Sequence, residues 1–466
     1  MEKYFDITLV GNNIATLVAA NELSKKNINF CIIHTSDFWG GHFSCIKKFD
    51  SNFDIGMTLL EFTDFNDSSN PSIELFDKTK KGDIGRYSSF LKNYLEKFVE
   101  LSEIETPKVL YKDLILDDFL ISNNIMEVKK LDIFNNMIAE ISDSTPDELH
   151  PSKKNKSDIF LKQNFHEVSE CNHGETFHKN IIDKYLTKVI NKNSSSIISR
   201  FHRQVWLPLY YPESLRLLED NIDVFAKKAT LFHYPLKSRV GNITKILKKN
   251  ISNKSIFFKN EQKSYFINYN DGSHQISFGD NKICSKEVFW SDNLESIRTD
   301  FSSNYKYDKA SIILFFALVP KNIIKLNFSV LNIINEDNFL YRITNQSKCS
   351  NSDDDDYHSI VCEANYDYFK EINPNCSDED IEKIFLNQLI TMSFINKVDS
   401  LDNSWAMILK NTYMIPSKNN YDNYLNHKNF IHKKYPEIYF SGQSNDLFSN
   451  SLNDQILQGL NFSSKF

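Results

Sequence analysis

The chain has 466 residues, a formal net charge of -7, 41% hydrophobic residues and 25% charged residues. This composition is typical of a soluble, folded protein with two or three domains and a large buried core. The acidic balance argues against a dedicated nucleic-acid-binding protein, which needs a basic surface. No apolar run is long enough to span a membrane, and no targeting segment precedes the first predicted strand, so we expect a cytoplasmic protein.

The first part of the chain has the pattern of a βαβ unit. An apolar run ends at Gly11, an alanine-rich helical pattern follows, and a second apolar run extends from Ile28 to Ile33. A unit of this length can bind a pyrophosphate at the helix N-terminus. Because the glycine motif is degenerate, the pattern also fits a βαβ unit that binds no ligand.

Three positions of this unit depart from the dinucleotide-binding pattern. Asn13 and Thr16 stand where the second and third glycines of the fingerprint are expected, and the second strand ends in His34 instead of an acid. Asparagine tolerates positive φ, so we predict that Asn13 allows the turn and donates a hydrogen bond toward the phosphates. We predict that His34 donates to a ribose hydroxyl.

The adjacent pair Gly40-Gly41 stands out because the chain is poor in glycine. It contains 12 glycines, whereas an ordinary usage near 7% would give roughly 33. A glycine pair in such a chain indicates a loop whose backbone lies close to a ligand.

The middle of the chain, residues 76 to 225, reads mostly as helices. Apolar residues recur three and four apart in Tyr87 to Ser102, Leu114 to Asn123, and Ile181 to Val189. Residues 141 to 175 are rich in Ser, Asp, Lys and Asn, and we predict a loop there. The aromatic residues between Gln204 and Pro212 fit a substrate pocket or, more commonly, a hydrophobic core.

From Phe232 onward the pattern returns to short strands and turns around one helix. Glu287 to Ser291 is predicted to be a buried strand that closes the nucleotide-binding sheet. A second, mostly antiparallel sheet is predicted from three apolar segments: Ala310 to Val319, Phe339 to Ile343, and Ser359 to Glu363. The C-terminal part reads as a strand at Glu437 to Gly442, a turn, and a helix at Ser451 to Gly459.

Two groups of polar residues raise the question of a metal. His166, Cys171, His173 and His178 could hold zinc, but their spacing matches no common zinc module, so we favour a histidine-rich polar loop and predict no metal. The run from Asp353 to Asp356 lacks the glycine and spaced glutamate of a calcium loop, and we predict a solvated loop. The seven cysteines without CxxC spacing indicate free thiols in a reducing compartment.

A series of landmarks runs along the chain in this order: Gly11, Gly40-Gly41, Phe53-Asp54-Ile55-Gly56, Phe232 to Pro235, Arg239-Val240-Gly241, Glu287 to Ser291, the strand with Arg342, Trp405 to Pro416, and the C-terminal segment from Gly442 to Ile456. Taken together, they resemble the FAD-dependent amine oxidase superfamily, especially its UDP-galactopyranose mutase-like and protoporphyrinogen oxidase-like branches. The C-terminal segment aligns without a gap on the mutase motif, with Gln443 and Asn453 in place of an arginine and an aspartate over the flavin.

The resemblance implies an α/β fold in which an α+β substrate domain is inserted into a Rossmann-like FAD-binding domain of the glutathione-reductase type. We expect the FAD-binding domain in residues 1-75, 226-300 and 400-466. A mainly helical substrate or cap region is expected in residues 76-225, and a mixed substrate domain in residues 301-399.

The resemblance also implies a non-covalent FAD in extended form, with adenosine near His34 and the isoalloxazine ring near Gly40-Gly41 and Gly442. The pyrophosphate would lie at the N-terminus of the helix that contains Ala15. His42 is the candidate for proton transfer at the flavin, with a structural hydrogen bond as its alternative role. The implied cofactor-binding residues are Gly11, Asn13, Ile14, Ala15, His34, Gly40, Gly41, Arg239, Val240, Gly442 and Asn453.

Three functions follow from the resemblance. The favoured one is an FAD-dependent oxidoreductase, of oxidase or dehydrogenase type, that transfers hydride from a small organic substrate to flavin. A nucleotide-sugar mutase-like enzyme is an alternative. A third is a cofactor-free scaffold that binds a protein partner, as Rab GDP-dissociation inhibitors do with a similar fold. The partner could also be a second copy of the chain in a homo-oligomer.

Overall fold

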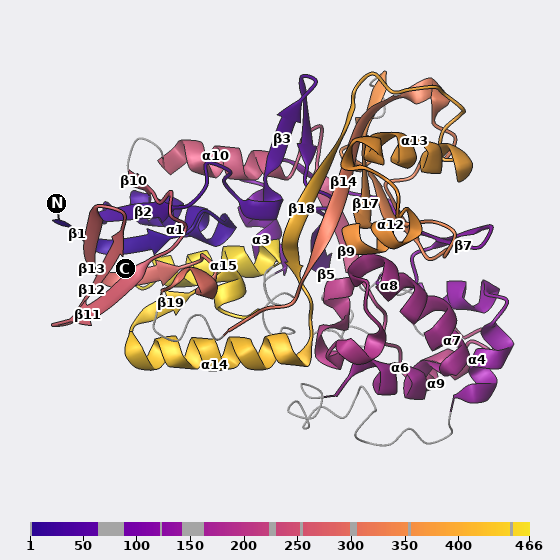
Figure 1. Cartoon of the computed structure of the whole chain (residues 1–466), viewed down its shortest axis with the longest axis horizontal. Coiled ribbons are helices and arrows are strands. Elements are labelled where there is room, and N and C mark those ends of the chain that lie inside the picture. The colour runs from indigo at the N-terminus through magenta and orange to yellow at the C-terminus, as the bar shows by residue number, and fades with distance from the viewer. Residues whose placement is uncertain are drawn as a thin grey trace. The chain divides into compact units, whose positions relative to one another are not determined.

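The computed structural model describes residues 2–63, 88–121, 124–141, 163–222, 230–251, 255–298, 305–352, 356–447 and 451–466 (Figure 1). Its contacts divide the chain into two compact units. Unit 1 comprises Met1–Cys45, Val240–Tyr307 and Asn419–Phe466, and unit 2 comprises Ile46–Arg239 and Asp308–Lys418. Residues 46–63, 230–239 and 400–418, which we expected in the FAD-binding domain, fall in unit 2, and residues 305–307, which we expected in the mixed substrate domain, fall in unit 1. The separation of residues 76-225 from residues 301-399 stays a prediction.

Unit 1 is built on a sheet in the order β10-β2-β1-β13-β12-β11, in which β19 also pairs with β13. The predicted strand at Glu287 to Ser291 is confirmed as the end of β13, which runs parallel to β1. The parallel strands are β1 (Glu2–Val10), β2 (Phe30–His34), β10 (Ile256–Lys259), β13 (Asn281–Trp290) and β19 (Ile438–Phe440). The strands β11 (Phe266–Asn270) and β12 (Ser273–Phe278) add an antiparallel meander.

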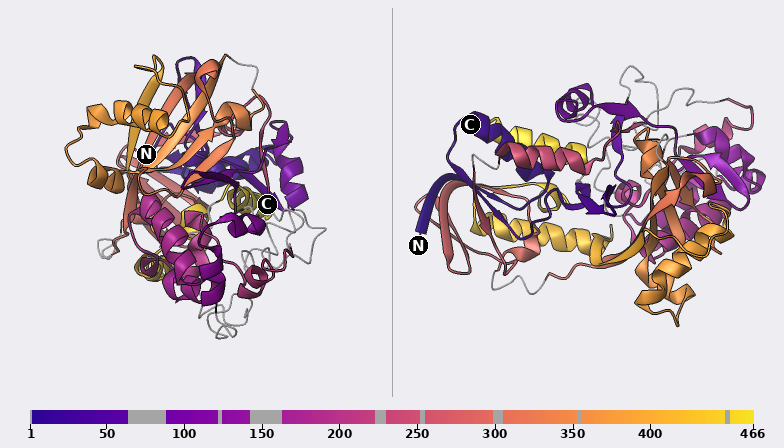
Figure 2. Two further views of the ribbon diagram at one scale, coloured as in Figure 1. Left: turned by 90° about the vertical axis from the view of Figure 1, so that its right-hand side faces the viewer. Right: turned by 90° about the horizontal axis from the view of Figure 1, so that it is seen from above.

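Helices cover the sheet of unit 1, which explains why β2 is buried along its whole length. Helix α1 (Ile14–Lys25) contacts both α10 (Gly241–Ile251) and α15 (Leu452–Ser463). Figures 1 and 2 show α10 and α14 (Lys418–Lys434) on opposite sides of the strands. The predicted C-terminal strand and helix are confirmed as β19 and α15.

Unit 2 contains a second sheet in the order β18-β14-β17-β16-β15-β7-β8. Among the described residues its strand pairs are antiparallel, except for the parallel pair of β15 and β7, so the predicted, mostly antiparallel sheet is confirmed. Its strands are β7 (Lys108–Tyr111), β8 (Leu114–Asp117), β14 (Lys309–Pro320), β15 (Val330–Ile333), β16 (Leu340–Asn345), β17 (Tyr357–Asn365) and β18 (Ser404–Met414).

The helix predicted at Leu114 to Asn123 is wrong, because Leu114–Asp117 forms β8 and pairs with β7. A tight turn with Lys112 at φ 53° joins the two strands. Short apolar runs fit either period. Here the tight turn and the pairing with the adjacent strand β7, which itself pairs with the distant strand β15, decided the outcome. Smaller sheets in unit 2 join β3 (Cys45–Lys48) with β4 (Ser51–Asp54), and β9 (Thr230–Pro235) with β5 (Leu60–Thr63) and β6 (Leu101–Glu103).

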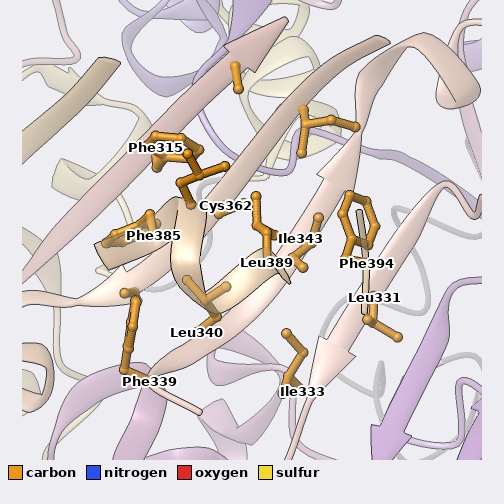
Figure 3. Packing of buried hydrophobic residues seen from close by; sticks show 14 of the residues in the cluster. Phe315, Leu331, Ile333, Phe339, Leu340, Ile343, Cys362, Phe385, Leu389 and Phe394 are labelled. Atoms are coloured by element: carbon orange, nitrogen blue, oxygen red, sulfur yellow. The ribbon is translucent and has the colours of Figure 1, made fainter. Parts of the chain in front are cut away.

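The main core of unit 2 lies between this sheet and the helices α12 (Tyr366–Ile372) and α13 (Ile381–Thr391). Figure 3 shows Phe315 and Cys362 from the sheet facing Phe385 and Leu389 of α13. The register of β16 and β17 shifts between Leu340 and Arg342. This irregularity explains how Leu340 and Ile343, three residues apart, both reach the same core.

Short helices make up much of the remainder of unit 2. They are α3 (Ser88–Leu95), α4 (Phe134–Glu140), α6 (Phe165–His173), α7 (Glu175–Phe177), the π-helical turn η5 (His178–Asp183), α8 (Lys184–Ile190), α9 (Pro212–Arg216) and α11 (Gln346–Cys349). The 3₁₀ turns within the described residues are η1 (Gly41–Phe43), η3 (Ile125–Lys130), η6 (Ser194–Ser196), η7 (Ser199–Val205), η8 (Leu294–Ser296), η10 (Lys321–Ile323), η11 (Asp378–Asp380) and η12 (Gly442–Ser444).

The loop predicted for residues 141 to 175 is wrong at its C-terminal end, where α6 begins. Asn164 caps this helix by accepting a hydrogen bond from the Glu167 amide at 3.0 Å, and Phe165 and Val168 are buried. Residues 142–162 of that segment and residues 353–355 of the acidic run lie outside the described residues. The core interpretation of the aromatic segment fits the burial of Leu207, Leu209 and Tyr210.

Within the described ranges, no helix has the length and apolar character needed to cross a membrane.

A buried histidine in unit 2 predicts a loss of stability in acid. The His202 ring stacks on Phe165, and its Nδ1 lies 2.7 Å from the Leu207 carbonyl oxygen. Burial lowers the pKa of His202 to about 3, whereas an unfolded histidine has a pKa of about 6.5. As the pH falls below about 6.5, His202 becomes protonated in the unfolded chain but stays neutral in the folded chain, so the free energy of unfolding decreases.

We expect His202 alone to lower the free energy of unfolding by about 2 kcal/mol between pH 8 and pH 5. The measurement is urea unfolding of the wild type and of His202→Asn at both pH values. Asparagine retains a donor toward Leu207 without titrating, so the difference between the two pH values should shrink in the variant. An equal pH dependence in both proteins would contradict the assignment.

Candidate cofactor site

The candidate site lies in unit 1, at the carboxyl ends of its parallel strands. Gly11 directly follows β1, and His34 is the last residue of β2. Ser291 directly follows β13, and Gly442 lies two residues after the end of β19. In open α/β sheets, the crevice at this edge is where ligands bind. The fold therefore brings together segments that are more than 400 residues apart in the chain.

Gly11 occupies a position that no other residue fits. Its φ is +114°, and a Cβ atom added to it would lie 2.2 Å from the Ser291 Oγ and 3.0 Å from the Asp292 amide nitrogen. Its own N–H donates to the Ile33 carbonyl at 2.8 Å. Gly11 thus joins β1 to α1 while the backbone after β13 approaches closely.

Asn13 caps helix α1 with an extended backbone, at φ -79°. Our prediction of a positive φ at this residue is therefore wrong. Its Oδ1 accepts a hydrogen bond from the Thr16 amide at 3.1 Å, which is the geometry of an N-cap residue, and its Nδ2 donates to the Ser291 carbonyl at 3.3 Å. The side chain thus serves the helix end instead of pointing away from it.

A second acceptor at the same helix end comes from the C-terminal helix. The Ile14 amide donates to the Gln455 Oε1 at 3.2 Å. Helix α15 comes this close to α1 because Gly459 has no side chain: a Cβ there would lie 2.6 Å from the Ala15 carbonyl oxygen. Ala15 itself is buried.

The residues at this helix end can accommodate a pyrophosphate. The first amides of a helix bind anions because they lack partners within the helix and carry the positive end of its dipole. The side-chain oxygens of Asn13 and Gln455 accept hydrogen bonds from two of these amides. Both side chains are uncharged and can rotate about their single bonds. Once they turn away, phosphate oxygens would take the positions of these two acceptors.

The glycine pair forms a turn bound to the loop between β1 and α1. Gly40 and Gly41 have φ angles of +98° and +60°, and the Gly40 amide donates to the Asn12 carbonyl at 2.7 Å. A Cβ on Gly40 would lie 2.4 Å from the Thr244 Cγ2, whereas a Cβ on Gly41 would meet no atom within 4 Å. Gly40 is therefore required by packing, and Gly41 leaves open space on its side of the loop.

His34 packs with the rings of Trp39 and Phe257, and the Lys248 ammonium lies over the latter two rings. This aromatic group was not predicted from the sequence. The His34 ring centroid is 4.8 Å from that of Trp39, and the Lys248 Nζ lies 4.1 Å from the Trp39 centroid and 3.2 Å from the Phe257 centroid. Burial lowers the pKa of Lys248 to about 8 and is also the main cause that lowers the pKa of His34.

The His34 Nδ1 lies 3.0 Å from the Ser36 carbonyl oxygen, which requires the hydrogen on Nδ1. In the neutral ring, Nε2 then carries a lone pair and accepts, as the usual carboxylate does. This role is the opposite of the donor role that we predicted. The position of Trp39 directly before the glycine pair is the one signal that could have indicated the aromatic group.

The remaining predicted site residues of unit 1 lie in three kinds of environment: beside Asn13, buried, or exposed. Gly442, at φ +60°, lies at the same site, since a Cβ there would be 2.8 Å from the Asn13 Nδ2. Asn453 on α15 and Val240 before α10 are buried. His42 is exposed, and its ring centroid lies 3.7 Å from that of Phe43.

Arg239 belongs to unit 2, where its guanidinium binds groups of that unit. It donates to the Asn52 carbonyl at 3.0 Å and to the hydroxyls of Ser350 and Ser359, each at 3.1 Å. Its predicted contact with a cofactor, like the proton-transfer role of His42, stays a prediction.

Comparison with known proteins gives structural neighbours only. No family model matches the sequence, and no curated protein does. The model is similar to a crystal structure of reduced UDP-galactopyranose mutase, with a TM-score of 0.72 at 14% identity over 99% of this chain and 93% of the mutase. It is also similar to a putative protoporphyrinogen oxidase from Exiguobacterium, with a TM-score of 0.63 at 11% identity over 99% of this chain and 98% of that one.

A third similar structure is cyclohexylamine oxidase from Brevibacterium oxydans, with a TM-score of 0.63 at 11% identity over 99% of this chain and 98% of the oxidase. Identities this low support a statement about the fold. The chain has the fold of the FAD-dependent amine oxidase superfamily, which its sequence resembles.

Proposed function

We propose that the protein is an FAD-dependent oxidoreductase, of oxidase or dehydrogenase type, that acts on a small organic substrate. One observation carries the proposal: Gly11, Gly40 and Gly442 all have positive φ and cluster around the loop that precedes α1. In a chain with only 12 glycines, compositional drift favours their loss. Their joint presence at the ligand-binding edge of the sheet supports a retained cofactor site.

Different residues of unit 1 would bind different parts of the cofactor. The amides of Ile14 and Thr16 would hold the pyrophosphate, and the Nε2 of His34 would accept from a ribose hydroxyl beside Trp39. Gly40-Gly41 would allow the loop to approach the flavin side. Bound FAD supplies the hydride acceptor. His42, exposed beside this pair, is the candidate for proton transfer.

A second candidate, the cofactor-free scaffold, is favoured by the contacts at α1. Asn13 and Gln455 already accept from the amides that would bind phosphate. The mutase-like alternative stays a prediction, because Gln443 replaces the arginine of that motif.

FAD titration distinguishes the two candidates. We expect the purified chain to show flavin bands near ~370 and ~450 nm, or to acquire them with added FAD. Gln455→Ala should tighten FAD binding about tenfold, because it removes a competing acceptor from a helix end that prefers an anion. Asn13→Gly should act in the same direction. Asn387→Ala, at an exposed position of α13, should leave the Kd unchanged.

The measurement is the Kd from quenching of flavin fluorescence, with circular dichroism to confirm folding. Failure of the folded wild type and of both variants to bind FAD would overturn the oxidoreductase proposal and favour the scaffold.

A further inference from the structure

A cluster of two histidines and two carboxylates lies in unit 2, in the helical segment around α6 and η5. The His166 Nδ1 is 2.9 Å from the His178 Nε2, and the His166 Nε2 is 3.3 Å from the Glu170 Oε1. One nitrogen or oxygen atom from each of His166, Glu170 and His178 lies within 4.8 Å of the others. The nucleotide-site residues of unit 1 take no part in this cluster.

The local backbone explains why these side chains meet. His166 and Glu170 are four residues apart on α6, so they share one face of the helix. His178 and Asp183 are five residues apart, which would separate them by about 140° around an α-helix. Because His178–Asp183 is a π-helical turn, the two side chains lie on one side, with the Asp183 Oδ2 3.2 Å from the His178 Nε2.

Hydrogen bonds alone account poorly for the groups around the His178 Nε2. This nitrogen lies 2.9 Å from the His166 Nδ1, 2.9 Å from the Ser194 Oγ and 3.2 Å from an Asp183 oxygen. It can carry one hydrogen at most, and therefore can donate well to only one of these three groups. The other ring nitrogen, Nδ1, is buried without a hydrogen-bond partner, so the polar contacts of the ring all lie on the Nε2 side.

We propose that His166, Glu170 and His178 bind a divalent transition metal, with zinc as the best match. Two imidazole nitrogens and one carboxylate are a common ligand set for zinc, at about 2.0–2.2 Å from the ion. Ligand atoms in a tetrahedral site are then about 3.3 Å apart, so the present atoms need shifts of less than about 1 Å each. Asp183 lies beside His178 as the carboxylate for a fourth position.

The burial of the ligands suits such a site. The His178 side chain is fully buried, whereas those of His166 and Glu170 are 39% and 33% exposed and have room to turn toward an ion. A shallow depression beside them is lined by Glu140, Glu167, Glu170, Cys171 and Glu175.

The assignment corrects our interpretation of this segment in two ways. The residues belong to helices and a π-helical turn, so the expected polar loop is wrong. Of the four residues considered as zinc ligands, His173 lies elsewhere: its Nε2 accepts from the Tyr210 amide at 2.8 Å, and its Nδ1 is 3.1 Å from the Ser169 Oγ. Cys171 is not in the ligand group, and Glu170 supplies the third ligand.

The test is zinc binding by the full chain after chelator treatment, measured by isothermal titration calorimetry. We expect one Zn²⁺ per chain, and at least an about tenfold weaker affinity in His166→Gln and in Glu170→Gln. Glu167→Gln removes a carboxylate from the exposed side of the same helix and should change the affinity by less than about twofold. Circular dichroism confirms that the variants fold.

Substitution of Co²⁺ provides a second readout. Absorption bands in the visible range, lost in His166→Gln but retained in Glu167→Gln, would support coordination by imidazole. The proposal is overturned if the wild type binds no Zn²⁺, or if all three variants weaken binding equally, since the latter would indicate attraction by the acidic surface alone.

Discussion

Replacement of Arg342 by leucine is expected to lower the free energy of unfolding of unit 2 by about 3–5 kcal/mol, because it leaves a buried carboxylate without its positive partner. Arg342 and Glu363 are both buried, and their closest nitrogen and oxygen are 3.5 Å apart. The guanidinium also donates to the Asn332 Oδ1 at 3.1 Å and to the Tyr185 hydroxyl at 3.4 Å. Urea unfolding followed by circular dichroism measures the change.

A double variant separates the unpaired charge from the lost packing. In Arg342→Leu combined with Glu363→Gln, the neutral amide oxygen can still accept from the Met57 amide, which donates to the Glu363 Oε1 at 3.0 Å. We expect the double variant to be more stable than Arg342→Leu alone. Arg298→Leu, at an exposed position, should change the stability by less than about 0.5 kcal/mol. Equal stabilities of the single and double variants would refute the charge explanation.

Replacement of Gly11 by alanine is expected to abolish FAD binding and to cost about 1–3 kcal/mol of stability. The added Cβ would lie 2.2 Å from the Ser291 Oγ, and adjustment of that hydroxyl alone cannot relieve the contact with the Asp292 amide nitrogen at 3.0 Å. The loop after β13 must then shift, and with it the carbonyl of Ser291 that the Asn13 side chain contacts. FAD titration and urea unfolding of the same preparation report the two effects.

Gly279 offers a matched control in unit 1. It also has a positive φ, +51°, but a Cβ there would meet no atom within 4 Å. Gly279→Ala therefore introduces backbone strain without a clash. It should cost about 1 kcal/mol and leave the FAD affinity unchanged. An equal loss of FAD binding in both variants would show that overall destabilisation, and not the site at Gly11, is responsible.

The helix end at α1 illustrates how far sequence reasoning reached. The βαβ unit was predictable because Gly11, the helix and the apolar second strand lie within one short segment. The role of Asn13 was misjudged, because an asparagine can permit a positive φ or cap a helix, and the contact with the distant Ser291 selects the second role. Gln455 could not be predicted at all, since it reaches Ile14 from 441 positions away.

The cluster of His166, Glu170 and His178, for which we propose a metal, illustrates the same limit in unit 2. The sequence placed His166 and His178 near each other, but spacing alone could not distinguish Glu170 from Cys171 as the third ligand. That choice depends on which residues share one face of α6 and on the π-helical turn at His178. Likewise, the strand at Leu114–Asp117 forms through pairing with β7, although its short apolar pattern also fits a helix.

The sequence by itself therefore determined the local elements with strong periodicity, the class of fold, and the glycines that the turns require, because these depend on neighbouring residues. The tertiary structure alone decided the contacts of Asn13, Gln455 and Arg239, and the set of groups around His178. Hydrogen-bond partners and metal ligands are chosen by distance and direction in space. Segments far apart in the chain acquire these only when the sheets and helices pack.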